Sequence, residues 1–173
     1  MNRLNTILIF FSVLFFSCFI KSNDKLNFEY DSDNKLTSLT KIIIQKTWEQ
    51  QPEGYTYPIN IKIPEEPQPI DGFPTCILLH GNGGNGQSMI NQFSSVLDRH
   101  VLIAPTGYLN SWNICDERSN APDLEMVDEL VNTLSNYSNI NLNKIRILGS
   151  SNGAGLANNI FIQNENPNID IIC

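Results

Sequence analysis

KIRILGSSNG, residues 144–153, is the stretch that decides the fold of this chain. KIRIL at its start predicts a strand, and a helical pattern begins at about residue 152. Between them stands the motif G-x-S-x-G, whose glycines let a strand and a helix approach closely around a sharp turn. An ordinary Gly/Ser turn is the alternative. The prediction we favour exposes the Ser151 hydroxyl at a helix N-terminus, where developing negative charge is stabilised.

A second glycine-rich stretch, HGNGGNG at residues 80–86, directly follows another apolar run. Glycines let a loop turn its backbone N–H groups toward one point without steric penalty. In sites built around a G-x-S-x-G turn, one oxyanion donor is the residue after the serine, and the other comes from such a loop. We therefore predict an oxyanion hole made by the backbone N–H groups of Asn152 and of Asn82 or Gly83.

The same loop also fits G-x-G-x-x-G, the fingerprint of a dinucleotide-binding site. That fingerprint requires an Asp or Glu at the end of the next strand to bind the ribose hydroxyl. The next apolar run, HVLIA at residues 100–104, ends in Pro-Thr-Gly and carries no acid. The loop also lacks the Gly-Lys-Ser/Thr ending of a P-loop. We therefore predict that the chain uses no cofactor.

The order of the apolar segments predicts an α/β fold. Residues 75–79 are a short, fully apolar run, typical of a buried parallel strand, and residues 100–104, 144–148 and 169–173 predict three more strands. Three helical patterns lie between them: residues 87–98, 123–134 and 152–163. Strands that alternate with helices form a mostly parallel sheet with helices on both faces. Ahead of them, residues 41–48 and 57–64 predict two strands that pair with each other as an antiparallel N-terminal edge.

The N-terminus has the features of an export signal. The apolar run at residues 7–20 is too short to span a bilayer comfortably, and polar residues follow it. Cys18 ends the sequence Leu-Phe-Phe-Ser-Cys, a loose lipobox with Phe15 in place of the usual aliphatic residue. A lipidated Cys18 and a Cys that merely stands in an apolar run are both open. We predict a signal peptide over residues 1–20, and a secreted, periplasmic or cell-surface lipoprotein.

Composition excludes several other classes of function. The formal net charge is −7, and no basic cluster is present, so nucleic acid is not an expected partner. Three cysteines follow the predicted signal peptide, and their spacing selects no disulfide pair. There is no CxxC and no His/Cys cluster, so we predict no metal site. Residues 21–38 are polar and charged and predict a tether between the signal peptide and a domain over residues 39–173.

A resemblance to a known family covers the chain from about residue 74 to its end. HGNGGNG, APTG at residues 104–107, SWN at residues 111–113 and NKIRILGSSNGAG resemble the polyhydroxybutyrate depolymerase and feruloyl esterase group of α/β-hydrolases. That group carries G-x-S-N-G-G, and here Ala154 replaces the last Gly. The resemblance implies that Ser151 is the nucleophile and that Trp112 lines the substrate cleft. A packing role in a long loop is the alternative for Trp112.

The resemblance also implies an acid and then a histidine after Ser151. Of the acids that follow it, Asp170 stands in or just before a strand rather than on a later loop, so we assign none as the triad acid. Both histidines, His80 and His100, precede the serine, and we expect His80 to be a structural residue of its loop. We therefore predict that residues 39–173 form a partial α/β-hydrolase domain, a piece of a longer hydrolase, with little esterase turnover of its own.

For the intact protein, the sequence predicts an exported serine esterase. Its substrate is a polyester, an acyl ester on a polysaccharide or a small ester, and the sequence does not choose among these. A peptidase with the same machinery stays open. The alternative from another class is a non-catalytic binding protein of the cell surface, built on a decayed hydrolase scaffold and anchored through Cys18.

Overall fold

The computed structural model describes residues 34–115, 119–163 and 166–172. The predicted signal peptide, Cys18 and most of the predicted tether lie outside the described residues, as do Glu165 and Cys173. None of the helices in the described ranges is long and apolar enough to cross a membrane.

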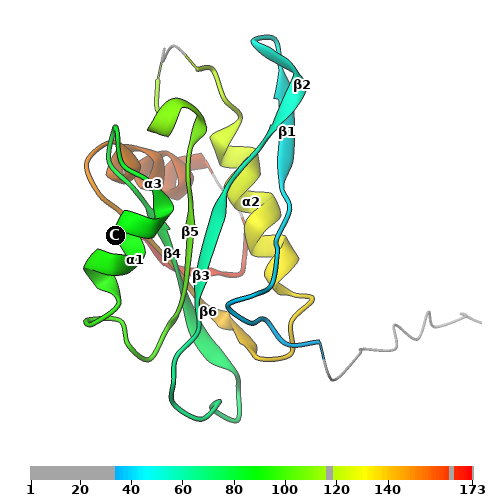
Figure 1. Cartoon of the computed structure of the whole chain (residues 1–173), viewed down its shortest axis with the longest axis vertical. Helices are drawn as coiled ribbons and strands as arrows, with labels where there is room; N and C mark the ends of the chain where they lie inside the picture. The colour runs from blue at the N-terminus through cyan, green and yellow to red at the C-terminus, as the bar shows by residue number, and fades with distance from the viewer. Residues whose placement is uncertain (1–33, 116–118, 164–165, 173) are drawn as a thin grey trace, which may run out of the picture. The chain divides into compact units, whose positions relative to one another are not determined.

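Strands and helices alternate along the described chain from residue 73 onward. The elements are β1 (Gln45–Trp48), β2 (Gln51–Thr56), β3 (Ile59–Lys62), β4 (Phe73–Leu79), α1 (Gly86–Phe93), β5 (Val101–Pro105), a 3-10 turn (Tyr108–Asn110), α2 (Asp123–Leu134), β6 (Ile140–Gly149), α3 (Asn152–Gln163) and β7 (Ile169–Ile172). The main sheet has the order β3-β5-β4-β6-β7, in which β4 to β7 run parallel and β3 is antiparallel at one edge (Figure 1). The predicted fold class is thus confirmed.

The pairing of the N-terminal strands differs from the prediction. We expected residues 41–48 to pair with residues 57–64, but β1 pairs with β2, a segment that the sequence pattern did not mark as a strand. β3 instead pairs with β5, with Ile59 opposite Pro105 and Lys62 opposite Leu102. A strand pairs with whichever neighbour leaves its backbone N–H and C=O groups unpaired along one side. The alternation of apolar and polar residues within a segment does not indicate which neighbour that is.

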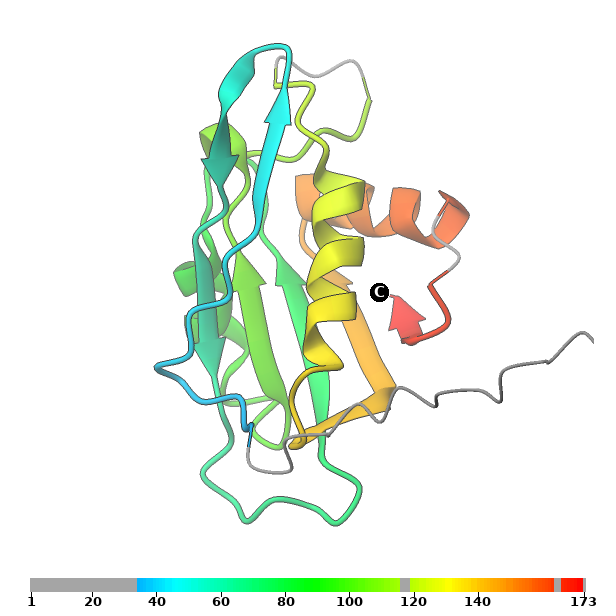
Figure 2. The ribbon, with the colours of Figure 1, turned by 90° about the vertical axis from the view of Figure 1, so that its right-hand side faces the viewer.

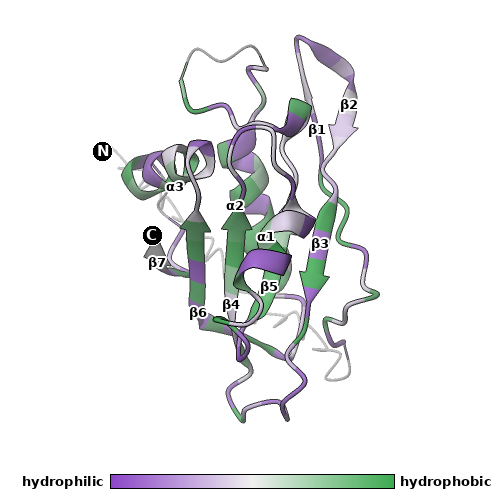
Figure 3. Ribbon diagram, turned by 60° about the vertical axis from the view of Figure 1, so that its left-hand side comes forward, coloured by the Kyte–Doolittle hydropathy of each residue, from purple (hydrophilic) through white to green (hydrophobic). Residues whose placement is uncertain are grey.

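Two apolar layers lie on opposite faces of the main sheet. Helices α2 and α3 pack on one face and α1 on the other (Figure 2). Successive residues of a strand point to opposite faces, so Ile77 of β4 joins the α2 layer while Cys76 and Leu78 join the α1 layer. In Figure 3 the strands β4 and β5 are mainly hydrophobic, β6 alternates between hydrophobic and hydrophilic residues, and α1 turns hydrophilic residues outward. Burial on both faces is the reason β4 and β5 are almost continuously apolar.

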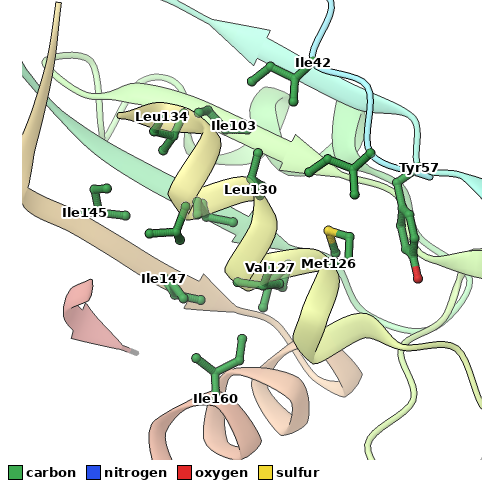
Figure 4. Close-up of a cluster of buried hydrophobic side chains, with 14 of the residues drawn as sticks. Ile42, Tyr57, Ile103, Met126, Val127, Leu130, Leu134, Ile145, Ile147 and Ile160 are labelled. Carbon is green, nitrogen blue, oxygen red and sulfur yellow. The ribbon is translucent and has the colours of Figure 1, made fainter. Parts of the chain in front are cut away.

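The apolar layer between the sheet and helices α2 and α3, here called the α2 layer, is the larger of the two. Leu130 and Val131 of α2 have no exposed surface, and neither do Ile103 of β5 and Ile145 of β6. Figure 4 shows side chains of α2 packed against those of the sheet, with Ile160 of α3 in the same cluster near the end of β6. Helix α2 spans residues 123–134, as its apolar periodicity predicted.

The folded part of the chain begins earlier than predicted. Leu36, in the stretch predicted as tether, is only 1% exposed. Its N–H donates to Asn139 Oδ1 at 2.8 Å, and its carbonyl accepts from Asn139 Nδ2 at 2.9 Å. A single leucine among polar residues gives no periodic signal, so only the tertiary structure reveals that this segment is anchored beside the turn before β6.

Replacing Leu130 tests the core of the α2 layer. We expect Leu130→Ala to lower the free energy of unfolding by about 2–5 kcal/mol, because it removes buried methyl groups and leaves a cavity. Urea denaturation followed by circular dichroism measures the loss. Leu39 is 89% exposed, and Leu39→Ala is the matched control, expected to change the free energy of unfolding by less than about 0.5 kcal/mol. Similar losses in the two variants would contradict the described core.

Candidate active site

The turn between β6 and α3 places Ser151 in a strained backbone conformation. Its φ angle is +52°, in the left-handed region that non-glycine residues seldom adopt. A Cβ atom on Gly149 would overlap the carbonyl oxygen of Gly153, and one on Gly153 would overlap the carbonyl oxygen of Leu79. Glycine at both positions is therefore required for this turn, and the Ser151 side chain is left exposed at the start of α3.

The glycine-rich loop after β4 lies directly against this turn. Strand β4 pairs in parallel with β6, with Leu79 opposite Gly149, and the Ser150 N–H extends the ladder by donating to the Leu79 carbonyl at 3.0 Å. A Cβ atom on Gly81 would stand 3.3 Å from Ser151 Cβ and 3.9 Å from its Oγ. The structure thus brings together the two motifs that the sequence analysis singled out.

Backbone amides around Ser151 differ in whether they are already hydrogen-bonded. The Gly83 N–H donates to the Asn110 carbonyl at 2.7 Å, so it is engaged away from Ser151. In the described part of the chain, no acceptor is recorded for the Asn82 N–H. Asn152 is the first residue of α3, where an amide has no carbonyl partner within the helix. Of the amides named from the sequence, those of Asn82 and Asn152 are the ones available to an oxyanion.

His80 is a structural residue of the glycine-rich loop, as predicted. It is 1% exposed, its Nε2 accepts from the Gly107 N–H at 3.1 Å, and its Nδ1 donates to the Gly81 carbonyl at 2.7 Å. Burial lowers the pKa of the imidazole, so it is neutral near pH 7. Both ring nitrogens are occupied, which leaves none to take a proton from Ser151.

Trp112 does not line a cleft, and the substrate-binding role implied by the resemblance is corrected here. The indole has no exposed surface. Its ring packs against the His80 ring with centroids 4.7 Å apart, and its Nε1 donates to the His80 carbonyl at 2.7 Å. A fully buried side chain cannot contact a substrate, so the packing alternative holds. The Ser-Trp-Asn motif could not distinguish these roles because burial is set by the surrounding elements.

The Asn152 side chain has a partner that sequence reasoning missed. Its Oδ1 accepts from the Trp112 N–H at 2.7 Å and from Ser111 Oγ at 3.3 Å, and its Nδ2 donates to the Trp112 carbonyl at 3.1 Å. Asn152 therefore contributes both a backbone amide at the site and a side chain that brackets one residue of a distant loop. No local signal in the motif indicates the second role.

Asp123 has a buried carboxyl group that hydrogen-bonds to Asn113, the residue after Trp112. It accepts from Tyr57 Oη at 2.8 Å and from the Asn113 N–H at 2.7 Å. Burial raises the pKa of Asp123 to about 6, although both hydrogen bonds act in the opposite direction. The helical pattern of residues 123–134 includes Asp123 but does not reveal its distant partner Tyr57.

The described residues place no general base or acid beside Ser151. His100 comes just before β5, and Ser151 follows β6. Because these strands run parallel, the two residues lie at opposite ends of the strands. The Nε2 of His100 lies 3.0 Å from Arg146, whose Nε lies 3.9 Å from Asp170 of β7. No histidine or carboxylate in the described ranges hydrogen-bonds to the Ser151 hydroxyl. A serine without such a partner is a poor nucleophile.

This arrangement of sheet and turn can be compared with known proteins. The structure is similar to the crystal structure of LpqC, a poly(3-hydroxybutyrate) depolymerase from Bordetella parapertussis, at a TM-score of 0.56 and 14% identity. The match covers 75% of this chain and 50% of that one. The BES protein from Bacillus cereus matches with a TM-score of 0.51 and 18% identity, over 78% of this chain and 61% of that one. The chain has an α/β-hydrolase fold.

This hydrolase fold is also found in a 2,6-dihydroxy-pseudo-oxynicotine hydrolase, at a TM-score of 0.50 and 19% identity. That match covers 74% of this chain and 35% of the other. No protein-family model matches the sequence, and no curated protein is significantly similar to it. The chain thus spans about a third to three fifths of the length of these three solved structures.

Adding a methyl group at Gly153 tests the tight turn between β6 and α3. We expect Gly153→Ala to lower the free energy of unfolding by about 1–3 kcal/mol or more, because the new Cβ meets the backbone of β4 and cannot be accommodated by side-chain motion. Thermal denaturation measures the loss. Asn158→Ala, at an exposed position of the same helix, is the control and should change little. An unchanged melting temperature in the glycine variant would contradict the described contact.

Asp123 predicts a specific pH dependence of stability. Its pKa in the folded state is about 6, against an ordinary value of 3.8. Between these values the folded state binds the proton more tightly, so the free energy of unfolding falls as pH rises from about 4 to 6 and then levels off. The contribution is about 2–3 kcal/mol.

Asp123→Asn should remove this component. Urea denaturation of wild type and variant at several pH values between 4 and 7 measures it, with Asp71→Asn as an exposed control. Parallel stability curves for wild type and the Asp123 variant would show that the buried carboxyl does not titrate in this range.

Proposed function

We propose that this chain carries the nucleophile and oxyanion hole of an exported serine hydrolase that cleaves carboxylic esters. The observation that carries the proposal is the strained, exposed Ser151 between β6 and α3, facing Gly81 of the glycine-rich loop. Strain of this kind persists only where the surrounding structure enforces it, and it is concentrated at functional sites. The G-x-S-x-G turn in its strand-to-helix context supports the same interpretation.

The geometry supports a two-step acyl transfer. Ser151 Oγ attacks the ester carbonyl carbon as its proton passes to a base, and the N–H groups of Asn152 and Asn82 bind the oxyanion. The intermediate collapses, the C–O bond to the leaving alcohol breaks, and the alcohol takes up the proton. Water then hydrolyses the acyl-serine by the reverse sequence and releases the carboxylic acid. No cofactor is required for any of these steps.

We propose that the base and the acid for these proton transfers are not among the described residues. Two observations support this proposal. The sequence has no histidine after Ser151, and the chain spans only half the length of the depolymerase that it resembles in fold. In this fold the acid and the histidine follow the serine in the chain.

The substrate class we propose is a polyester or an acyl group linked to a polysaccharide. Support comes from the sequence resemblance to depolymerases and feruloyl esterases, and from a fold shared with a poly(3-hydroxybutyrate) depolymerase. We further propose that the protein acts outside the cytoplasm, directed there by the export signal of residues 1–20 and held by a lipid anchor at Cys18. The net charge of −7 agrees with a partner other than nucleic acid.

A non-catalytic binding protein of the cell surface is the second candidate. The observation that favours it is the lack of any imidazole or carboxylate against the Ser151 hydroxyl within the described ranges. In such a protein, binding of an ester polymer survives removal of the serine hydroxyl, whereas an esterase loses its turnover.

Labelling with a fluorophosphonate probe distinguishes the two candidates. We expect the probe to label Ser151 in the full-length protein and p-nitrophenyl butyrate to be hydrolysed, because the probe reacts with a serine that a base activates. Ser151→Ala should abolish both signals, and Ser95→Ala, at an exposed position after α1, should leave them unchanged. A full-length protein that neither takes the label nor hydrolyses the ester is the outcome that favours the binding protein.

A further inference from the structure

The loop of residues 111–113 connects the two arms of the oxyanion hole. One arm is the glycine-rich loop after β4, where the His80 carbonyl accepts a hydrogen bond from Trp112 Nε1 at 2.7 Å. The other arm is the start of α3, where the Asn152 side chain hydrogen-bonds to both the N–H and the carbonyl of Trp112, at 2.7 and 3.1 Å. A single residue thus touches both elements that supply the oxyanion donors.

We propose that Trp112 and the Asn152 side chain are positioning residues that fix the separation of the Asn82 and Asn152 backbone amides. The inference rests on the proposed function, in which those two amides bind the oxyanion. Neither side chain contacts the substrate in this role: each acts through the backbone that it holds.

The physical need for such a connection follows from how an oxyanion hole works. Two donors stabilise one oxygen only when each lies about 2.7–3.1 Å from the position that the oxyanion occupies. Here the donors belong to elements that are far apart in the sequence. A displacement of about 1 Å between them costs on the order of 100-fold in rate. A rigid link between the two elements therefore has a direct effect on the transition state.

Trp112 is suited to orient the first arm. Its indole has only two rotatable bonds, is fully buried, and packs on the His80 ring. The hydrogen bond to the His80 carbonyl fixes the plane of the peptide between His80 and Gly81, one residue before the Asn82 amide. The Gly107 N–H holds the His80 ring from its other side. Glycine at position 81 restricts this backbone little by itself, so the orientation depends on these contacts.

Asn152 is suited to hold the second arm because a carboxamide carries an acceptor and a donor side by side. Its Oδ1 and Nδ2 bracket one residue through its N–H and its carbonyl. A carboxylate at this position offers no donor to the Trp112 carbonyl, and alanine offers neither group. The bracket fixes the first turn of α3 relative to Trp112, and with it the direction of the Asn152 amide.

The longer segment between β5 and α2 has further anchors that contact neither the glycine-rich loop nor the first turn of α3, and these supply matched controls. Asn159, further along α3, donates from Nδ2 to the Ile114 carbonyl at 2.7 Å. Trp48 of β1 donates from its indole Nε1 to the Ser119 carbonyl at 2.6 Å. Each control residue is of the same type as a test residue and makes the same kind of hydrogen bond, without contact to the glycine-rich loop.

The experiment compares Trp112→Phe and Asn152→Ala with Trp48→Phe and Asn159→Ala in the full-length protein. We expect the two test variants to lower kcat for p-nitrophenyl acetate about 10- to 100-fold with KM within about twofold, because only transition-state stabilisation is lost. The controls should stay within about threefold of wild type in kcat. We also expect Trp112→Phe combined with Asn152→Ala to lose less than the product of the single losses, since both act on one geometry.

Amide hydrogen exchange provides a readout that does not depend on turnover. Peptides that cover residues 80–83 and 151–153 should exchange at least about tenfold faster in the test variants, while the control variants leave them unchanged. If wild type shows no Ser151-dependent hydrolysis, the proposed function fails, and exchange alone decides the positioning role. Unchanged exchange in both test variants, or equal loss of kcat in test and control variants, would overturn the inference. Should Trp112→Phe not fold, the Asn152 and Asn159 pair decides it.

Discussion

The parallel pairing of β4 with β6 is the constraint on which the rest of this structure depends. It sets Leu79 beside Gly149 and lets the Ser150 amide continue the ladder. Because the strands run in the same direction, their carboxyl ends meet at one edge of the sheet, and the loops that follow them come into contact. Helix α3 then starts so close to β4 that a Cβ atom on Gly153 would overlap the carbonyl oxygens of Leu79 and His80. The strained serine is a consequence of this close approach.

The polar contacts around the site form one connected system rather than separate pairs. Asn152 holds Trp112, Trp112 holds His80, and Asp123 holds Asn113 in the same loop. All of these groups are partly or fully removed from water, and a buried polar group that loses its partner costs about 1–3 kcal/mol. These hydrogen bonds hold residues 111–113 in a defined conformation outside any helix or strand. That conformation in turn links the two elements next to the nucleophile.

Sequence reasoning succeeded where a signal is local and strong. The apolar periodicity of α2 and the motif before α3 gave both helices their observed bounds, and the fully apolar runs gave the parallel strands. It failed where the outcome depends on a distant partner. The strand β2 contains Pro52 and Gly54 and shows no alternating pattern, so its pairing with β1 was missed. Trp112 was equally compatible with a cleft and a core, and only its surroundings decided that it is buried.

The sequence by itself determined the α/β class, the strand-to-helix turn at Ser151 and the glycine-rich loop, because each follows from residue types that are adjacent in the chain. Tertiary structure alone decided which strands are neighbours, that the Gly83 amide is engaged by Asn110, and that the Asn152 side chain serves Trp112. These are contacts between residues far apart in the sequence. Their geometry is set by packing against the sheet, and no local pattern of residues records it.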